Sequence, residues 1–281
     1  AISGPLNIDM AEIEDWNCCG ATEYVALNKN AAYALIGRNL ALGSQSGSDT
    51  MVAPCSACYL NLKKTDHYMG KHDELNAKTN KALAAGGLSY EPGSLQIRHM
   101  LDVVVNDIGF DRVREEVTRP LEGLKVAAYY GCLIVRPEFE QFFDDPEFPN
   151  HLDTLMETLG AEAVDFSMKT RCCGGHMPQI SADTAYDLIY GILSDANRKE
   201  ADVIVTICPM CQLNLDAYQN QVNKQYGTDF ELPILYFTQM MGLAMGFSEK
   251  ELGLGKEFIK ASPVLKKIGT DTRKPQSKRR R

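Results

Sequence analysis

The chain has 281 residues, of which 44% are hydrophobic and 23% charged, and its formal net charge is −8. This size allows two domains or one large duplicated domain and excludes a small fold held together by disulfides. The acidic balance argues against a nucleic-acid partner, and no apolar run reaches the roughly 18 residues of a membrane span.

The elements of the first half alternate between strand and helix. Residues 8–13 are expected to form a strand that leads to Cys18-Cys19-Gly20, and a helix follows over about 22–42. A strand at 49–53 runs into Pro54-Cys55-Ser-Ala-Cys58, with a helix at 59–71 behind it. Residues 97–105 are predicted to be the closing strand.

The second half repeats this order after a charged boundary at residues 112–123. Strands are predicted at 124–130, 162–166, 201–207 and 233–237, and helices at 150–159, 184–200, 212–226 and 238–245. The fold class is therefore α/β, with two pseudo-symmetric, Rossmann-like halves, and strand ends are where such folds place their ligand sites. We expect domains at residues 1–115 and 116–270.

The cysteines show that the two halves share one framework. Cys18-Cys19-Gly20 recurs as Cys172-Cys173-Gly174, 154 positions later, and Cys55-x-x-Cys58 recurs 153 positions later. The second pair is Cys208-x-x-Cys211.

The ninth cysteine, Cys132, ends a predicted strand 40 positions before Cys172. Its counterpart in the first half would precede the start of the sequence, so we expect the N-terminal part of the first domain to be missing.

Thiolates are soft ligands for iron–sulfur clusters, zinc or cuprous copper. Adjacent cysteines point in different directions and suit an extended cofactor better than a single ion. Five cysteines in the second half exceed the four of a structural zinc site or an ordinary cubane. Three alternatives stay open: a zinc site, a thioredoxin-like catalytic dithiol, and buried cysteines without a ligand.

Almost the whole chain resembles the cysteine-rich CCG domain family, to which the B subunits of heterodisulfide reductases belong. The resemblance is carried by Glu14-Asp-Trp-Asn-Cys-Cys-Gly-Ala21, Tyr130-Gly-Cys132, Arg171-Cys-Cys-Gly-Gly175 and Cys208-Pro-Met-Cys211.

The resemblance implies two noncubane [4Fe-4S] clusters that face a shared cavity. There a small disulfide, in methanogens that of coenzyme M and coenzyme B, is cleaved to two thiols. The implied partners are the ferredoxin-like and the flavin-containing subunits of a heterodisulfide-reductase-type complex. Cys18, Cys19, Cys172 and Cys173 would act in catalysis as cluster ligands. One cluster would be held by Cys132, Cys172, Cys173, Cys208 and Cys211, and the other by Cys18, Cys19, Cys55 and Cys58.

Two other functions stay open. The first is an electron-transfer subunit of a lactate or glycolate oxidase or of a succinate dehydrogenase, and the second is a zinc-bound structural protein. Nine cysteines favour a reducing compartment, so a cytoplasmic location is expected.

Outside the cysteines, His176 lies three positions after Cys173 and is a candidate proton donor to a substrate thiolate. Arg171 is a candidate for offsetting cluster charge or holding an anionic group. Trp16 is expected to pack over the site. The basic run 271–281 is predicted to be a disordered tail.

Overall fold

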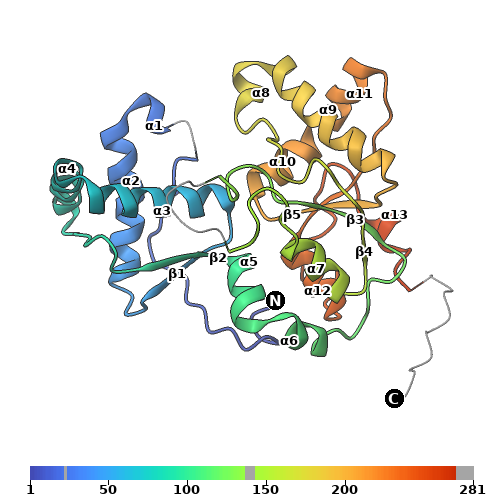
Figure 1. The fold of residues 1–281 in the computed structure, drawn as a ribbon, viewed down its shortest axis with the longest axis horizontal. Coiled ribbons are helices and arrows are strands. Elements are labelled where there is room, and N and C mark those ends of the chain that lie inside the picture. The colour runs from blue at the N-terminus through green and yellow to red at the C-terminus, as the bar shows by residue number, and fades with distance from the viewer. Residues whose placement is uncertain (22–23, 137–142, 270–281) are drawn as a thin grey trace.

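The structure is a computed structural model that describes residues 1–21, 24–136 and 143–269 (Figure 1). The basic run 271–281 lies outside the described residues. Two α/β halves are arranged side by side, with the N-terminus between them and next to α5 (Met100–Asp102) and α6 (Phe110–Glu115). The predicted α/β class is confirmed.

The second half is built on a four-stranded parallel sheet in the order β4-β3-β5-β6. Side chains alternate between its two faces, because successive strand residues point in opposite directions. Val126 and Ala128 enter a core on one side, whereas Ala127 and Tyr129 enter a second core on the other. The strands are β3 (Lys125–Tyr129), β4 (Glu162–Ala163), β5 (Val203–Thr206) and β6 (Ile234–Tyr236).

Helices cover both faces of this sheet, as a parallel sheet requires. Figure 1 shows α9, α10 and α11 above it and α7 and α12 below it. The helices of this half are α7 (His151–Thr158), α8 (Met177–Ile180), α9 (Ala182–Arg198), α10 (Pro209–Ala217), α11 (Gln219–Tyr226), α12 (Phe237–Ala244) and α13 (Ser262–Leu265).

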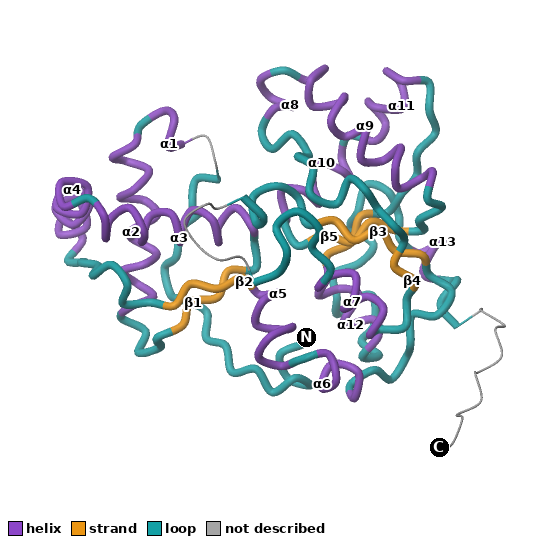
Figure 2. Tube along the Cα trace, in the orientation of Figure 1, coloured by secondary structure: helices purple, strands orange, loops and turns teal. Residues whose placement is uncertain are grey.

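The first half contains a parallel pair of strands, β1 (Thr50–Ala53) and β2 (Gln96–His99), beside a group of helices (Figure 2). Strand β1 has the same place relative to its cysteine pair as β5 has in the second half. The helices are α1 (Tyr24–Leu27), α2 (Lys29–Ser44), α3 (Ser56–Lys71), α4 (Asp73–Leu83), the 3₁₀ turn η1 (Ala84–Gly86), α5, the π-helical turn η2 (Val103–Ile108) and α6.

Two predicted strands of the first half are wrong. Residues 8–13 have no regular structure, and their four central residues are all exposed, so they lack the buried face that a strand pairs and packs. The strand predicted at 97–105 ends at His99 and continues as α5 and η2. Its Val103, Val104 and Val105 are buried in helical geometry, because a short apolar run fits either element.

One hydrophobic core connects the two halves. It contains Ile36 and Leu40 from α2, Leu101 from α5, and Val126 from β3. A second core, on the other face of β3 and β5, belongs to the second half and reaches three of its cysteines. The cysteine motifs therefore sit at the meeting point of two packed bodies.

Candidate metal centre

Each C-x-x-C pair begins a helix immediately after a parallel strand. Cys55 is the N-cap residue of α3 with φ −137° and ψ 126°, and Cys208 is the N-cap of α10 with φ −133° and ψ 119°. The two turns thus have matching backbones. Backbone N–H groups at a helix N-terminus favour negative charge. They help to lower the pKa of Cys208, whereas interaction with the Cys208 thiol raises the pKa of Cys55 to about 12.

The two Cys-Cys-Gly turns also match each other. In both, the two residues after the cysteines have positive φ, 73° and 49° at Gly20 and Ala21 and 94° and 55° at Gly174 and Gly175. This shape turns the chain back sharply. As a result Cys19 and Cys173 are buried, whereas the preceding Cys18 is exposed.

Six thiols form one continuous row across the boundary between the halves. At one end, the sulfurs of Cys19 and Cys58 lie 3.1 Å apart. In the middle, the thiols of Cys55 and Cys208, one from each half, lie close enough to shift each other's pKa, upward for Cys55 and downward for Cys208. At the other end, the sulfurs of Cys173 and Cys211 lie 3.4 Å apart. In order along the row the residues are Cys19, Cys58, Cys55, Cys208, Cys211 and Cys173.

Hydrogen bonds between the thiols favour the anionic form of particular sulfurs. The bond with Cys58 lowers the pKa of Cys19 to about 6. Bonds with Cys211 and Cys55 lower the pKa of Cys208 to about 2, with help from backbone amides at the start of α10. Both halves therefore present a thiolate, which is the form that binds metals.

Cys132 and Cys172 form a separate pair beside the row. Their hydrogen bond lowers the pKa of Cys172 to about 6, and the nearby Arg136 guanidinium acts in the same direction. Gly131 places this pair close to the row, because a Cβ there would lie 3.0 Å from the sulfur of Cys211. Among the described residues of the first half, no strand or cysteine corresponds to β3 and Cys132.

Two buried asparagines brace the Cys-Cys-Gly turns. Asn61 follows Cys58 by three residues and donates to the carbonyl oxygens of Cys19 (3.2 Å) and Ala21. Asn214 follows Cys211 by three residues and donates to the equivalent carbonyls of Cys173 (3.2 Å) and Gly175 (2.7 Å). The side-chain nitrogens also lie 3.6 and 3.7 Å from the Cys19 and Cys173 sulfurs.

The closing strands tie each half to the cysteine turn of the other. His99, the last residue of β2, is fully buried and its Nε2 lies 3.2 Å from the carbonyl oxygen of Ile207, which precedes Cys208. Its Nδ1 accepts from Leu101 N–H, so Nε2 carries the proton and donates.

The second half makes the reciprocal contact. Tyr236, the last residue of β6, donates from its hydroxyl to the carbonyl of Pro54, which precedes Cys55. Burial and the surrounding thiolates raise the pKa of Tyr236, so the hydroxyl keeps its proton. These crossed contacts fix Cys55 and Cys208 opposite each other.

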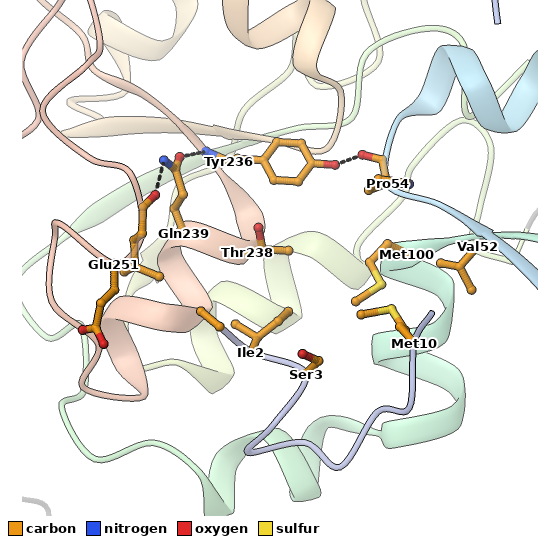
Figure 3. Close-up of a pocket in the computed structure, with 12 residues that line it drawn as sticks. Ile2, Ser3, Met10, Val52, Pro54, Met100, Tyr236, Thr238, Gln239 and Glu251 are labelled. Carbon is orange, nitrogen blue, oxygen red and sulfur yellow. Dashed lines mark hydrogen bonds between the residues drawn. The ribbon is translucent and has the colours of Figure 1, made fainter. Parts of the chain in front are cut away.

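A cavity of about 360 Å³ borders this contact (Figure 3). Pro54 and Tyr236 form part of its wall, Met10 and Met100 contribute apolar surface, and Glu251 adds a negative charge. Gln239 lies in the wall and holds the backbone of Tyr236 at 2.8 Å.

Comparison with known proteins agrees with this arrangement. The family described as "Cysteine-rich domain" (CCG) matches residues 1–63 and 126–216, which include all nine cysteines. The chain belongs to the CCG family. The paired turns and C-x-x-C helices described above are thus features of a CCG protein.

Relatives along the full chain are named as subunits of two kinds of reductase. The chain is 35% identical to the 8-methylmenaquinol:fumarate reductase membrane anchor subunit of Wolinella succinogenes, over 94% of this chain and 91% of that protein. It is 33% identical to the B subunit of the ferredoxin:CoB-CoM heterodisulfide reductase of Methanosarcina mazei, over 94% and 88%.

The fold also has a solved counterpart. A crystal structure of a hypothetical protein from Helicobacter pylori matches with a TM-score of 0.67 at 15% identity. The match covers 88% of this chain and 45% of that one, and it supports the fold alone.

The donor set of this CCG protein fits an iron–sulfur group by its chemistry, since it consists of soft thiols, several of them held as thiolates. Within the described residues, no three His, Cys, Asp or Glu side chains surround a common point where a metal ion could bind. Sulfurs 3.1 and 3.4 Å apart leave no space between them, so a bound cluster requires them to move apart.

The sequence also proposed three site residues that are not cysteines, namely His176, Arg171 and Trp16. His176 is half-buried at the start of α8, directly after the second turn, and its role as a proton donor stays a prediction. Arg171 contributes its backbone carbonyl, which accepts from the Tyr129 hydroxyl at 2.5 Å. Trp16 is 58% exposed and donates to Glu12 rather than being enclosed.

Five residues near the thiols are not predicted by the sequence analysis. They are His99, Tyr236, Arg136, Asn61 and Asn214. Only the asparagines had a sequence signal, because they repeat with the C-x-x-C pairs at the same offset of 153. No helix among the described residues is long and apolar enough to cross a membrane.

Proposed function

We propose that this chain is an iron–sulfur, electron-transferring subunit of a multi-subunit oxidoreductase, and that it reduces a small disulfide to two thiols. The observation that carries the proposal is the single row of thiols that joins both cysteine motifs at Cys55 and Cys208. Two separate structural metal sites would not need to meet in this way. Names of full-length relatives, all subunits of reductases, support the same class.

The proposed cofactors are two [4Fe-4S] clusters of the noncubane type. The second would be held by Cys132, Cys172, Cys173, Cys208 and Cys211. The first would be held by Cys18, Cys19, Cys55 and Cys58, with no fifth cysteine among the described residues. When bound, such clusters supply single electrons at potentials set by charge, hydrogen bonding and exposure.

Cleavage of a disulfide consumes two electrons and two protons and breaks one S–S bond to give two thiols. The chain would hold its two electron donors side by side, because the contacts of His99 and Tyr236 fix the halves against each other. Arg136, close to Cys132 and Cys172, offsets the negative charge of reduction. His176 is the proposed proton donor to one leaving thiolate.

The proposed partners are the ferredoxin-like and the flavin-containing subunits of a heterodisulfide-reductase-type complex, which would bring the electrons. The disulfide of coenzyme M and coenzyme B is one proposed substrate, since two relatives of about one-third identity are named for it. We place the complex in the cytoplasm, where nine thiols stay reduced.

A second candidate is an electron relay that never touches a disulfide. It is favoured by the 35% identical fumarate reductase subunit from Wolinella succinogenes. In that case electrons would pass along the row of thiol-held centres from a donor subunit to a flavin subunit.

The test begins with iron, acid-labile sulfide and zinc per chain on protein purified without oxygen. About eight irons and an EPR signal that depends on added thiol would support two clusters and a disulfide reductase. Turnover of a small disulfide with a one-electron donor dye then separates the two candidates. Loaded protein that passes electrons without consuming disulfide supports the relay, and zinc without iron overturns both.

A further inference from the structure

Asn61 and Asn214 occupy equivalent positions in the two halves. Each follows the second cysteine of a C-x-x-C pair by three residues and so projects from the same side of its helix, one turn further along. Both are buried, with 5% and 3% of their surface exposed. A buried amide costs free energy unless its hydrogen bonds are made, so these contacts are specific.

Their bonding is the same in both halves. The amide nitrogen donates to the carbonyl of the second cysteine in the Cys-Cys-Gly turn and to the carbonyl two residues later. The turn contains two consecutive residues of positive φ, including Ala21 at 49°, a conformation that a residue with a Cβ adopts only at a cost. Asn61 therefore holds a strained turn closed, and Asn214 makes the same bonds to a turn in which both residues of positive φ are glycines.

The same nitrogens lie 3.6 Å from the sulfur of Cys19 and 3.7 Å from that of Cys173. An amide N–H that faces a sulfur stabilises negative charge on it. We propose that Asn61 and Asn214 are positioning residues, which hold Cys19 and Cys173 opposite Cys58 and Cys211 and donate an N–H···S hydrogen bond to each thiolate.

For protein with bound clusters, the proposal rests on the proposed function, because it assumes that Cys19 and Cys173 are cluster ligands. A donor to a ligand sulfur favours the more negative, reduced state of a cluster and raises its potential. The asparagines would then set both the geometry and the potential of the two centres in the same way.

The first experiment uses metal-free protein, so that it does not depend on a cluster. Diamide, which takes up two electrons and two protons as a disulfide forms, is added to the native chain and to N61D and N214D. Peptide mapping then follows the Cys19–Cys58 and Cys173–Cys211 cross-links. The carboxylate cannot donate and repels both carbonyls, so we expect each cross-link to form about tenfold more slowly in its own variant.

Asn80→Asp and Asn223→Asp are matched controls. Asn80 bonds the backbone N–H and carbonyl of Tyr90, and Asn223 bonds those of Phe230, in the same two halves. They carry the same change of charge and lie on α4 and α11, helices that contain no cysteine, so they should leave both cross-linking rates unchanged. Native rates in N61D and N214D would overturn the proposal.

The second experiment measures iron retention and the EPR-monitored potential after loading. We expect a 10- to 100-fold weaker hold on iron and a tenfold shift toward the oxidised state, which is about 59 mV for one electron. If an Asp variant does not fold, Asn→Ser removes the amide without adding a charge and should lower the potential in the same direction. Native protein without iron would sink the proposed function, and the cross-linking rates would still decide the positioning role.

Discussion

At the scale of single residues, steric space around the thiols is the tightest constraint. Gly131 has φ 73°, and a Cβ there would lie 3.0 Å from the sulfur of Cys211. Gly227 has a similar φ of 67° and no atom within 4 Å of the position of its Cβ. An alanine at either position strains the backbone, but only an alanine at Gly131 would also push against the Cys211 sulfur.

We therefore expect Gly131→Ala and Gly227→Ala to lower the unfolding free energy of the metal-free protein by a similar amount, about 1 kcal/mol. Only Gly131→Ala should also lose iron, because it displaces Cys211. Urea titrations and iron analysis on both variants check this. Equal iron contents would show that Cys211 tolerates the displacement.

Because the two Cys-Cys-Gly turns have matching backbones, each can be given the residue type that the other has at the equivalent position. Ala21 and its counterpart Gly175 have similar positive φ angles, 49° and 55°, but only Ala21 carries a Cβ. We expect Ala21→Gly to stabilise the metal-free protein by about 0.5 kcal/mol, since removal of the Cβ strain outweighs the greater freedom of glycine in the unfolded chain. Gly175→Ala should destabilise it. A loss of stability in Ala21→Gly, measured by urea unfolding, would contradict the match between the turns.

At the scale of elements, the last residues of two strands make the contacts that join the halves at the cysteine turns. His99 and Tyr236 end β2 and β6 in equivalent registers, opposite Ala53 and Thr206, and each reaches the turn of the other half. A histidine at such a place makes the contact sensitive to pH.

Burial lowers the pKa of His99 from 6.5 to about 4, so the folded protein keeps it neutral where the unfolded chain takes up a proton. Stability from this residue is thus fully present above pH 6.5 and is lost as the pH falls toward 4. The shift corresponds to about 3 kcal/mol. We expect His99→Gln, which keeps a neutral donor, to lack this component.

The measurement is the unfolding free energy of both metal-free proteins between pH 7 and pH 4. Carboxylates contribute equally to the two curves, so the difference between them isolates His99. Parallel curves over the whole range would mean that the ring takes up its proton in the folded state as readily as in the unfolded chain.

The sequence predicted the second half better than the first for a physical reason. The apolar run that became β3 lies between Gly123 and Gly131, and the β-branched run that became β5 follows the amphipathic helix α9, so length and pattern agree. Val103, Val104 and Val105 form an equally apolar run, but nothing local distinguishes a buried strand from a buried helical turn. The cysteine framework was predicted because it repeats. Asn61 was not predicted, although it recurs as Asn214 at the same offset.

Contacts between the halves could not be read in this way. His99 and Ile207 are 108 residues apart, and Tyr236 and Pro54 are 182 apart. Such pairs depend on how the two packed bodies meet, and no spacing or periodicity in a single chain encodes that. The row of thiols across the boundary was accordingly invisible until the fold was known.

At the scale of the whole molecule, the shared core makes the two halves one cooperative unit. Leu101 is fully buried in the core that contains both α2 and β3. We expect Leu101→Ala to lower the unfolding free energy by about 2 to 5 kcal/mol. The loss should appear equally in hydrogen exchange of α2, in the first half, and of β5, in the second, in metal-free protein.

Leu213→Ala is the matched control, because this leucine on α10 is 57% exposed and its truncation removes little buried surface. Its exchange rates should stay at the native level in both halves. If Leu101→Ala instead weakened protection in α2 while β5 kept its native rates, the halves would unfold separately. The thiols that meet across the boundary would then part whenever the first half opened, and a site shared by the two motifs would last only as long as that half stays folded.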